Sequence, residues 1–64
     1  MQHYSSKELK SILEANGWFV VRVKGDHWHF KHKEIKGTIT LTHPVKDVSR
    51  IIVKSIIDKS GLDL

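Results

Sequence analysis

The ten residues from 24 to 33, Lys-Gly-Asp-His-Trp-His-Phe-Lys-His-Lys, contain the side chains best suited to chemistry. Three histidines and three lysines surround two aromatic residues there. Imidazoles exchange protons near neutral pH, and lysines attract phosphate. One such group can take the proton of an RNA 2′-hydroxyl while nearby cations stabilise the developing phosphorane. The segment therefore suits cleavage of RNA, a reaction that needs no metal ion.

Residues 26–33 of this segment alternate with a period of two, which is typical of a β-strand with one buried face. In this pattern Trp28 and Phe30 face a core. His27, His29 and Lys31 then share the opposite face. The sequence therefore predicts two histidines and a lysine on an open sheet face.

Two other interpretations of these residues stay open. Histidines on an exposed strand are usually solvated polar residues, and Trp18 and Trp28 more often pack in a small core than stack on bases. A metal site formed by His27 and His29 is the other alternative. The chain has no cysteine and no carboxylate–histidine spacing typical of a zinc module, so we expect no metal.

A short amphipathic helix precedes these residues. Ser5 and Glu8 have the spacing of a capping box, and Tyr4 can form a hydrophobic staple with Leu9. Apolar residues then recur on one helical face, and Asn16-Gly17 is suited to end the helix. The apolar residues of this face are Leu9, Ile12 and Leu13.

Three strands and a second helix follow. The β-branched and aromatic runs 18–23, 26–33 and 38–42 predict strands, with a turn at Gly25-Asp26 and a stop at His43-Pro44. Six apolar residues at helical spacing between 48 and 57 predict the last helix. Asp47 or Ser49 caps it and Gly61 closes it. These six residues are Val48, Ile51, Ile52, Val53, Ile56 and Ile57.

This order predicts a two-layer α+β fold, α-β-β-β-α, in which both helices cover one face of a three-stranded antiparallel sheet. Its 64 residues form a single domain, 1–64. Eleven Lys and Arg against seven Asp and Glu give a formal charge of +4, which favours a polyanion such as nucleic acid as partner. No membrane span or signal peptide is recognisable, so we expect a cytoplasmic protein.

The whole pattern resembles the HicA-type mRNA interferases, the toxins of HicAB toxin–antitoxin systems. The resemblance covers nearly the whole chain in an ordered set of short motifs. They are Ser6-Lys7-Glu8-Leu9, Leu13-Glu14-Ala15-Asn16-Gly17-Trp18, Arg22-Val23-Lys24-Gly25-Asp26-His27, Phe30-Lys31-His32, Thr40-Leu41-Thr42-His43-Pro44, Lys46-Asp47-Val48, Lys54-Ser55-Ile56-Ile57 and Ser60-Gly61-Leu62.

The resemblance implies a fold like that of double-stranded-RNA-binding domains and ribosome-independent cleavage of mRNA. It also implies a HicB-type antitoxin that masks the active histidine. We expect no cofactor. The family's functional histidine follows Gly-Ser, which matches His27 here. The chain departs from the family in having Asp26 for the usual Ser and Trp28 for a frequent second His. An acid at that position can orient the imidazole or can repel the scissile phosphate. The last helix also has Ile51-Ile52 where the family tends to have Gly-Thr, a change expected to alter packing.

The leading hypothesis is an mRNA endoribonuclease in which His27 is the general base or acid. His29 is the candidate second proton carrier, and His43 is a third candidate. The phosphate-binding candidates are Lys24, Lys31 and Lys33. The alternatives are a non-catalytic RNA-binding module of the same fold, whose RNA affinity falls with salt, and a protein-interaction domain without RNA affinity.

Overall fold

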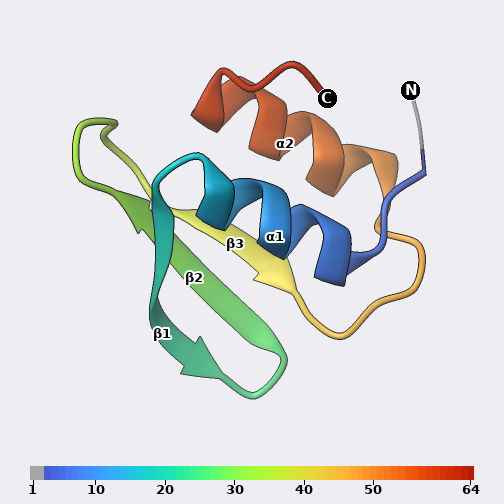
Figure 1. The fold of residues 1–64 in the computed structure, drawn as a ribbon. Helices are drawn as coiled ribbons and strands as arrows, with labels where there is room; N and C mark the ends of the chain where they lie inside the picture. Colours follow the sequence, from blue (N-terminus) through green and yellow to red (C-terminus); the bar gives the residue numbers. More distant parts are fainter. Residues whose placement is uncertain (1–2) are drawn as a thin grey trace.

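The computed structural model describes residues 3–64 and shows two helices over one face of a three-stranded sheet (Figure 1). Met1 and Gln2, part of the stretch considered for a signal peptide, lie outside the described residues. The elements in chain order are α1 (Ser6–Ala15), β1 (Trp18–Lys24), β2 (His27–His32), β3 (Ile39–Thr42) and α2 (Arg50–Ser60). This confirms the predicted α+β order and the fold similar to double-stranded-RNA-binding domains.

Helix α1 begins and ends at the predicted residues. The Ser5 hydroxyl accepts from the Glu8 N–H at 3.1 Å, and the Glu8 carboxylate accepts from the Ser5 N–H at 3.0 Å. This capping box satisfies two of the backbone donors that a helix N-terminus leaves free. Leu9 and Leu13 are fully buried on the inner face. Gly17, with φ of 90°, takes the left-handed conformation that turns the chain into β1.

The sheet is an antiparallel meander with strand order β1-β2-β3, so the strand with the histidines is central. Gly25 and Asp26 form the predicted turn between β1 and β2. The pairs at the strand ends are Trp18–His32, Lys24–His27, His27–Thr42 and Phe30–Ile39.

Helix α2 is capped by Ser49, one of the two predicted residues, and closed by Gly61 in the left-handed conformation. One member of its predicted apolar stripe does not pack: Ile51 is 82% exposed. At 100° per residue, Ile51 lies about 200° around the helix from the buried Val53 and therefore faces solvent. Of the Ile51-Ile52 pair, only Ile52 is packed against the core, so an effect on packing is expected from Ile52 and not from Ile51.

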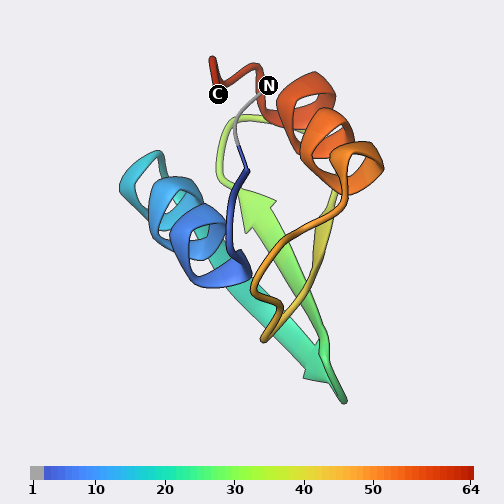
Figure 2. The ribbon, with the colours of Figure 1, turned by 90° about the vertical axis from the view of Figure 1, so that its right-hand side faces the viewer.

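Both helices lie on the same side of the sheet, and the opposite side stays uncovered (Figure 2). The core fills the space between the two layers. Trp18 is 2% exposed, so it is a packing residue. Within residues 3–64, no helix is long and apolar enough to cross a membrane. The core residues are Tyr4, Leu9, Leu13, Trp18, Phe30, Ile39, Leu41, Val48, Val53 and Ile56.

Candidate active site

A β-bulge in β1 determines which side chains share the uncovered sheet face with the histidines. Val20 pairs with Phe30 and Arg22 pairs with His29, so Val21 is an extra residue without a partner in β2. Strict alternation from Trp18 would have placed Arg22 on the core side. The bulge instead places Arg22 on the uncovered face, directly across from His29.

Because β2 is central, each of its outward histidines is flanked on both sides. Directly opposite residues in an antiparallel sheet lie on the same face. His27 therefore lies between Lys24 of β1 and Thr42 of β3. His29 lies between Arg22 and Thr40 in the neighbouring row, and Lys31 lies opposite Phe19 in the row after that. The predicted grouping of His27, His29 and Lys31 on one face is thus present.

His27 is the more accessible of the two histidines. Its side chain is 57% exposed at the tip of the β1–β2 hairpin. Its Nδ1 lies 3.8 Å from Oδ1 of Asp26, a distance that permits charge attraction but is too long for a hydrogen bond. The carboxylate therefore adds negative potential beside the ring without fixing its orientation.

His29 is held more firmly. Its ring is half-buried, and Nδ1 forms a 3.0 Å hydrogen bond with the Thr40 hydroxyl. This contact uses Nδ1, so Nε2 is the nitrogen available to a substrate. The sequence suggested His29 by alternation alone, whereas its threonine partner on β3 became visible only with the strand register.

The third histidine of the segment, His32, lies outside this site. Its Nδ1 accepts from the backbone N–H of Glu34 at 3.0 Å and of Ile35 at 3.3 Å. A nitrogen that accepts carries no proton, so Nε2 bears it and donates to the Asn16 carbonyl at 3.0 Å. The ring also packs edge-on against Trp18. With both nitrogens engaged, His32 is a structural residue.

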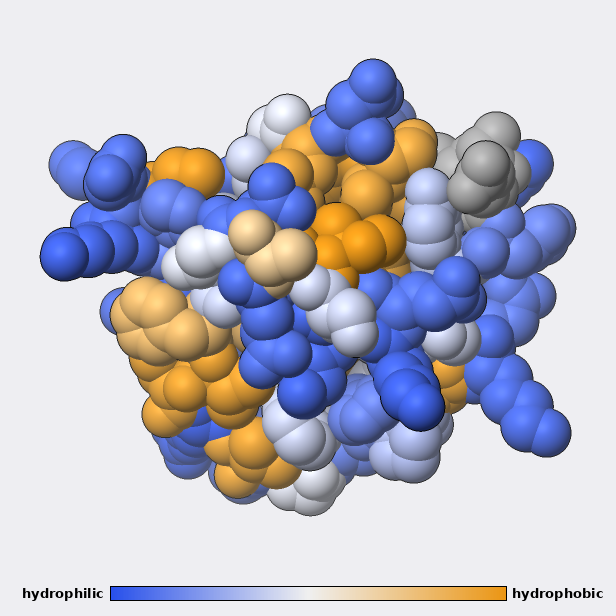
Figure 3. Space-filling view, in the orientation of Figure 1, coloured by the Kyte–Doolittle hydropathy of each residue, from blue (hydrophilic) through white to orange (hydrophobic). Residues whose placement is uncertain are grey.

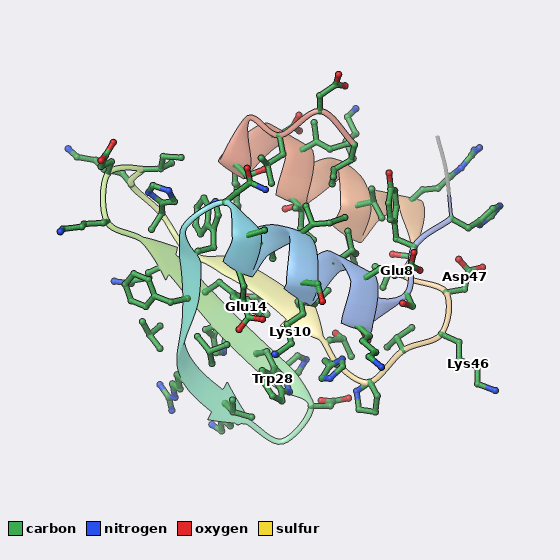
Figure 4. All side chains as sticks on the ribbon, viewed as in Figure 1. Glu8, Lys10, Glu14, Trp28, Lys46 and Asp47 are labelled. Atoms are coloured by element: carbon green, nitrogen blue, oxygen red, sulfur yellow. The ribbon has the colours of Figure 1, made fainter. Side chains whose placement is uncertain are left out.

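His43 lies on the other side of the sheet. Its Nδ1 is 2.7 Å from the Ser6 hydroxyl oxygen, and its ring stands perpendicular to Trp28 with a centroid separation of 5.0 Å. Trp28 faces the helix layer, where Lys10 approaches its ring at 5.5 Å (Figure 4). The structure therefore does not bring His43 to the face that carries His27 and His29.

The candidate phosphate-binding lysines are spread along this face. Lys24 lies in the His27 row and Lys31 lies in the row next to that of His29, while Lys33 follows the end of β2. A pocket of about 430 Å³ lies at that end, lined by residues 31–37 and by neither His27 nor His29. The pocket is therefore separate from the candidate catalytic pair. Arg22 is the cation that sequence reasoning missed, because nothing in the sequence marks the bulge.

Within residues 3–64, no three side chains of His, Asp or Glu come together in a way that could hold a metal ion. Asp26 lies beside His27, but with His29 it does not form such a group. What the face offers chemically is imidazole nitrogens, hydroxyl groups and fixed positive charge.

Comparison with known families settles the relationship of the chain. The family profile described as "HicA toxin of bacterial toxin-antitoxin" matches residues 6–62 of the 64. The chain belongs to this family. A search among curated proteins found no significant match. A HicA toxin acts within a toxin–antitoxin system, so the chain has an antitoxin as partner.

Asp26 and Trp28, two positions that differ from the pattern expected of the family, lie in different surroundings. Asp26 is in the hairpin turn beside His27, 64% exposed, where it acts on the candidate site directly. Trp28 points toward the helices, so a histidine at this position would not share the face of His27. Trp28 therefore does not affect which side chains share the uncovered face.

Proposed function

We propose that this HicA toxin is an endoribonuclease that cleaves mRNA without the ribosome and uses His27 as general base or acid. One observation carries the proposal: the uncovered face presents His27 beside Lys24, and His29 beside Arg22, in adjacent rows. A proton carrier next to a cation is what phosphodiester cleavage requires. The proposed site of action is the cytoplasm, where mRNA is found.

The chemistry needs two proton transfers and no metal. One imidazole removes the proton of the 2′-hydroxyl, and the 2′-oxygen then attacks the adjacent phosphorus. The bond from phosphorus to the 5′-oxygen breaks, and that oxygen takes a proton from the other imidazole. His27 and His29 are two residues apart on one strand face, about 7 Å between Cα atoms, so they can flank one phosphodiester. The products are a 2′,3′-cyclic phosphate and a 5′-hydroxyl.

The cations have a distinct role in this scheme. The phosphorane that forms during attack carries more negative charge than the starting diester. Lys24 lies directly across from His27 and Arg22 directly across from His29, so both are placed to stabilise that charge. Lys31 and Lys33 continue the positive charge along the path of the RNA backbone.

The test is cleavage of a purified mRNA in the presence of a chelator. We expect the wild type to cut it and the His27→Ala variant to be about 10²–10⁴-fold slower. His3→Ala is the matched control, because His3 is an exposed histidine paired with Asp47 far from β2 in the chain. An RNA with a single 2′-deoxy position should resist cleavage at that position, since the attacking group is absent.

Two outcomes would refute the proposed endoribonuclease activity. If His27→Ala cuts as fast as the His3→Ala control, then His27 has no part in the reaction. If neither protein cuts but both bind RNA in a salt-dependent way, the chain is an RNA-binding module of the same fold. The carboxylate of Asp26 beside His27 favours the RNA-binding module over the enzyme, because it repels the scissile phosphate that cleavage would have to place at His27.

The proposed control of this activity is a HicB-type antitoxin that covers the histidine face. The family requires an antitoxin, and the positively charged face is the part of the toxin that RNA must reach. The antitoxin should therefore protect RNA from cleavage when it is added in equal amount. Continued cleavage by a fully bound toxin would contradict masking of the site.

A further inference from the structure

The outer edge of β1 is an unpaired strand edge with an apolar surface. Within residues 3–64, β1 pairs only with β2, so its other side presents free backbone donors and acceptors. Of the four large exposed apolar side chains in the described part of the chain, three lie on this one strand: Phe19 at 49%, Val21 at 47% and Val23 at 49%. Figure 3 shows apolar atoms gathered over β1 at the lower left. Such an edge invites pairing with another chain.

The bulge distributes these three side chains around the edge. Phe19 is opposite Lys31 on the uncovered face, whereas Val23 is opposite Trp28 on the helix side. Val21 lies at the bulge between them. A strand laid along β1 would therefore find apolar contacts on both of its faces, in addition to backbone hydrogen bonds.

Charge identifies the kind of strand that fits. Residues 18–33 contain four basic residues and one acidic residue, Asp26. Arg22 and Lys24 project from β1 on the uncovered face, where an added strand would place its own side chains directly opposite. Acidic side chains in those positions form cross-strand ion pairs. A second copy of this chain would instead join two positively charged faces.

We propose that the β1 edge is the docking site of the antitoxin, which adds a strand with alternating apolar and acidic residues. The identity of this partner rests on the toxin–antitoxin function, and the site itself rests on the edge. Acidic residues paired with Arg22 and Lys24 neutralise the cations beside the histidines. The antitoxin thereby prevents RNA from binding at His27 through charge as well as coverage.

The test is an NMR titration of the whole chain with an end-blocked peptide, Glu-Val-Glu-Val-Glu-Val-Glu, which matches the seven residues of β1. We expect amide shifts concentrated in β1, with a dissociation constant of about 1 mM. A peptide with Lys in place of each Glu should not bind. Val21→Asp should weaken binding about 10-fold or more, whereas Ile51→Asp, at the exposed apolar residue of α2, should not.

Several results would overturn the proposal. They are the absence of β1 shifts up to about 5 mM peptide, equal binding of the Lys peptide, and equal effects of the two Asp variants. Shifts of β1 that depend on toxin concentration alone would assign the edge to a second copy.

RNA cleavage by the same variants separates this proposal from the proposed nuclease. Val21→Asp should still cleave RNA, because Val21 is not among the residues placed at the histidine rows. If the wild type binds the acidic peptide at β1 but cuts no RNA, then the nuclease fails and the docking site stands. If the wild type cuts RNA but does not bind the peptide, then the docking site fails and the nuclease stands.

Discussion

The Nδ1 atom of His43 lies 2.7 Å from the hydroxyl oxygen of Ser6, which is 37 residues away in the sequence. The same hydroxyl oxygen accepts from the Val45 N–H at 2.7 Å and lies 3.1 Å from the Val45 carbonyl. With the proton of the imidazole on Nδ1, the hydroxyl accepts two hydrogen bonds and donates one. These hydrogen bonds connect the start of α1 to the chain after β3. The Ser6 side chain that forms them is buried, with 1% of its surface exposed.

Ser6→Ala should lower the free energy of unfolding by about 1–3 kcal/mol, because it leaves the Val45 N–H without its side-chain acceptor. Urea denaturation of the variant measures this loss. Ser11→Ala is the control, since Ser11 is an exposed serine on the same helix. Equal stability of the two variants would show that the hydroxyl contributes nothing to the connection.

Gly17→Ala should destabilise the fold by about 1–3 kcal/mol for two reasons. Its φ of 90° is strained for alanine, and an added Cβ would lie 2.8 Å from Nε2 of His32. Gly25→Ala is the matched control, because Gly25 also has a positive φ but nothing lies within 4 Å of its Cβ position. Thermal unfolding should show the larger loss at Gly17. A loss as large at Gly25 would mean that the contact with His32 is harmless.

The capping box should make stability depend on pH in acid. Hydrogen bonds with Ser5 hold the pKa of Glu8 below its usual value of 4.5. The hydrogen bond from the backbone N–H of Ser5 has the larger effect, and the one with its side chain has the smaller. A carboxyl group with a lowered pKa stabilises the fold fully above the unfolded value, and this contribution is lost as pH falls through the folded value. Wild type should therefore exceed Glu8→Gln in stability at neutral pH, and the difference should shrink below about pH 4.5. A difference that stays constant down to acid pH would contradict this.

The fold could be predicted from the sequence because each element has a local signal. The Ser5–Glu8 spacing marks the start of α1, and the alternation around Phe30 marks β2. Burial then forces both apolar helix faces onto one side of the sheet. These signals involve neighbours in sequence, so they need no knowledge of strand register.

The candidate site could be predicted only in part. Alternation assigned His27 and His29 to one face, but the bulge that brings Arg22 beside them results from pairing between strands and has no sequence signature. For the same reason the roles of the other histidines were not visible. His32 and His43 are engaged by partners distant in the sequence, Asn16 and Ser6 among them.

His29→Ala should slow RNA cleavage about 10²–10⁴-fold if His29 is the second proton carrier. Thr40→Val tests how His29 is positioned, since it removes the 3.0 Å hydrogen bond to Nδ1 while keeping the shape of the side chain. We expect it to lower kcat more than it raises KM, with a smaller loss than His29→Ala. Single-turnover cleavage across pH measures both. Full activity of His29→Ala would require a different second proton carrier.

Lys24→Gln should weaken RNA binding and reduce its dependence on salt, because Lys24 lies across from His27 on the uncovered face. Loss of one phosphate contact on single-stranded RNA should lower the slope of log K against log salt by about 0.7. Lys54→Gln removes the same charge from the exposed side of α2, in the helix layer, and should leave the slope unchanged. Fluorescence anisotropy with a labelled RNA measures both slopes. Equal reductions of the two slopes would mean that RNA binding depends on net charge alone. The histidine face would then not be a specific binding site for the phosphate backbone.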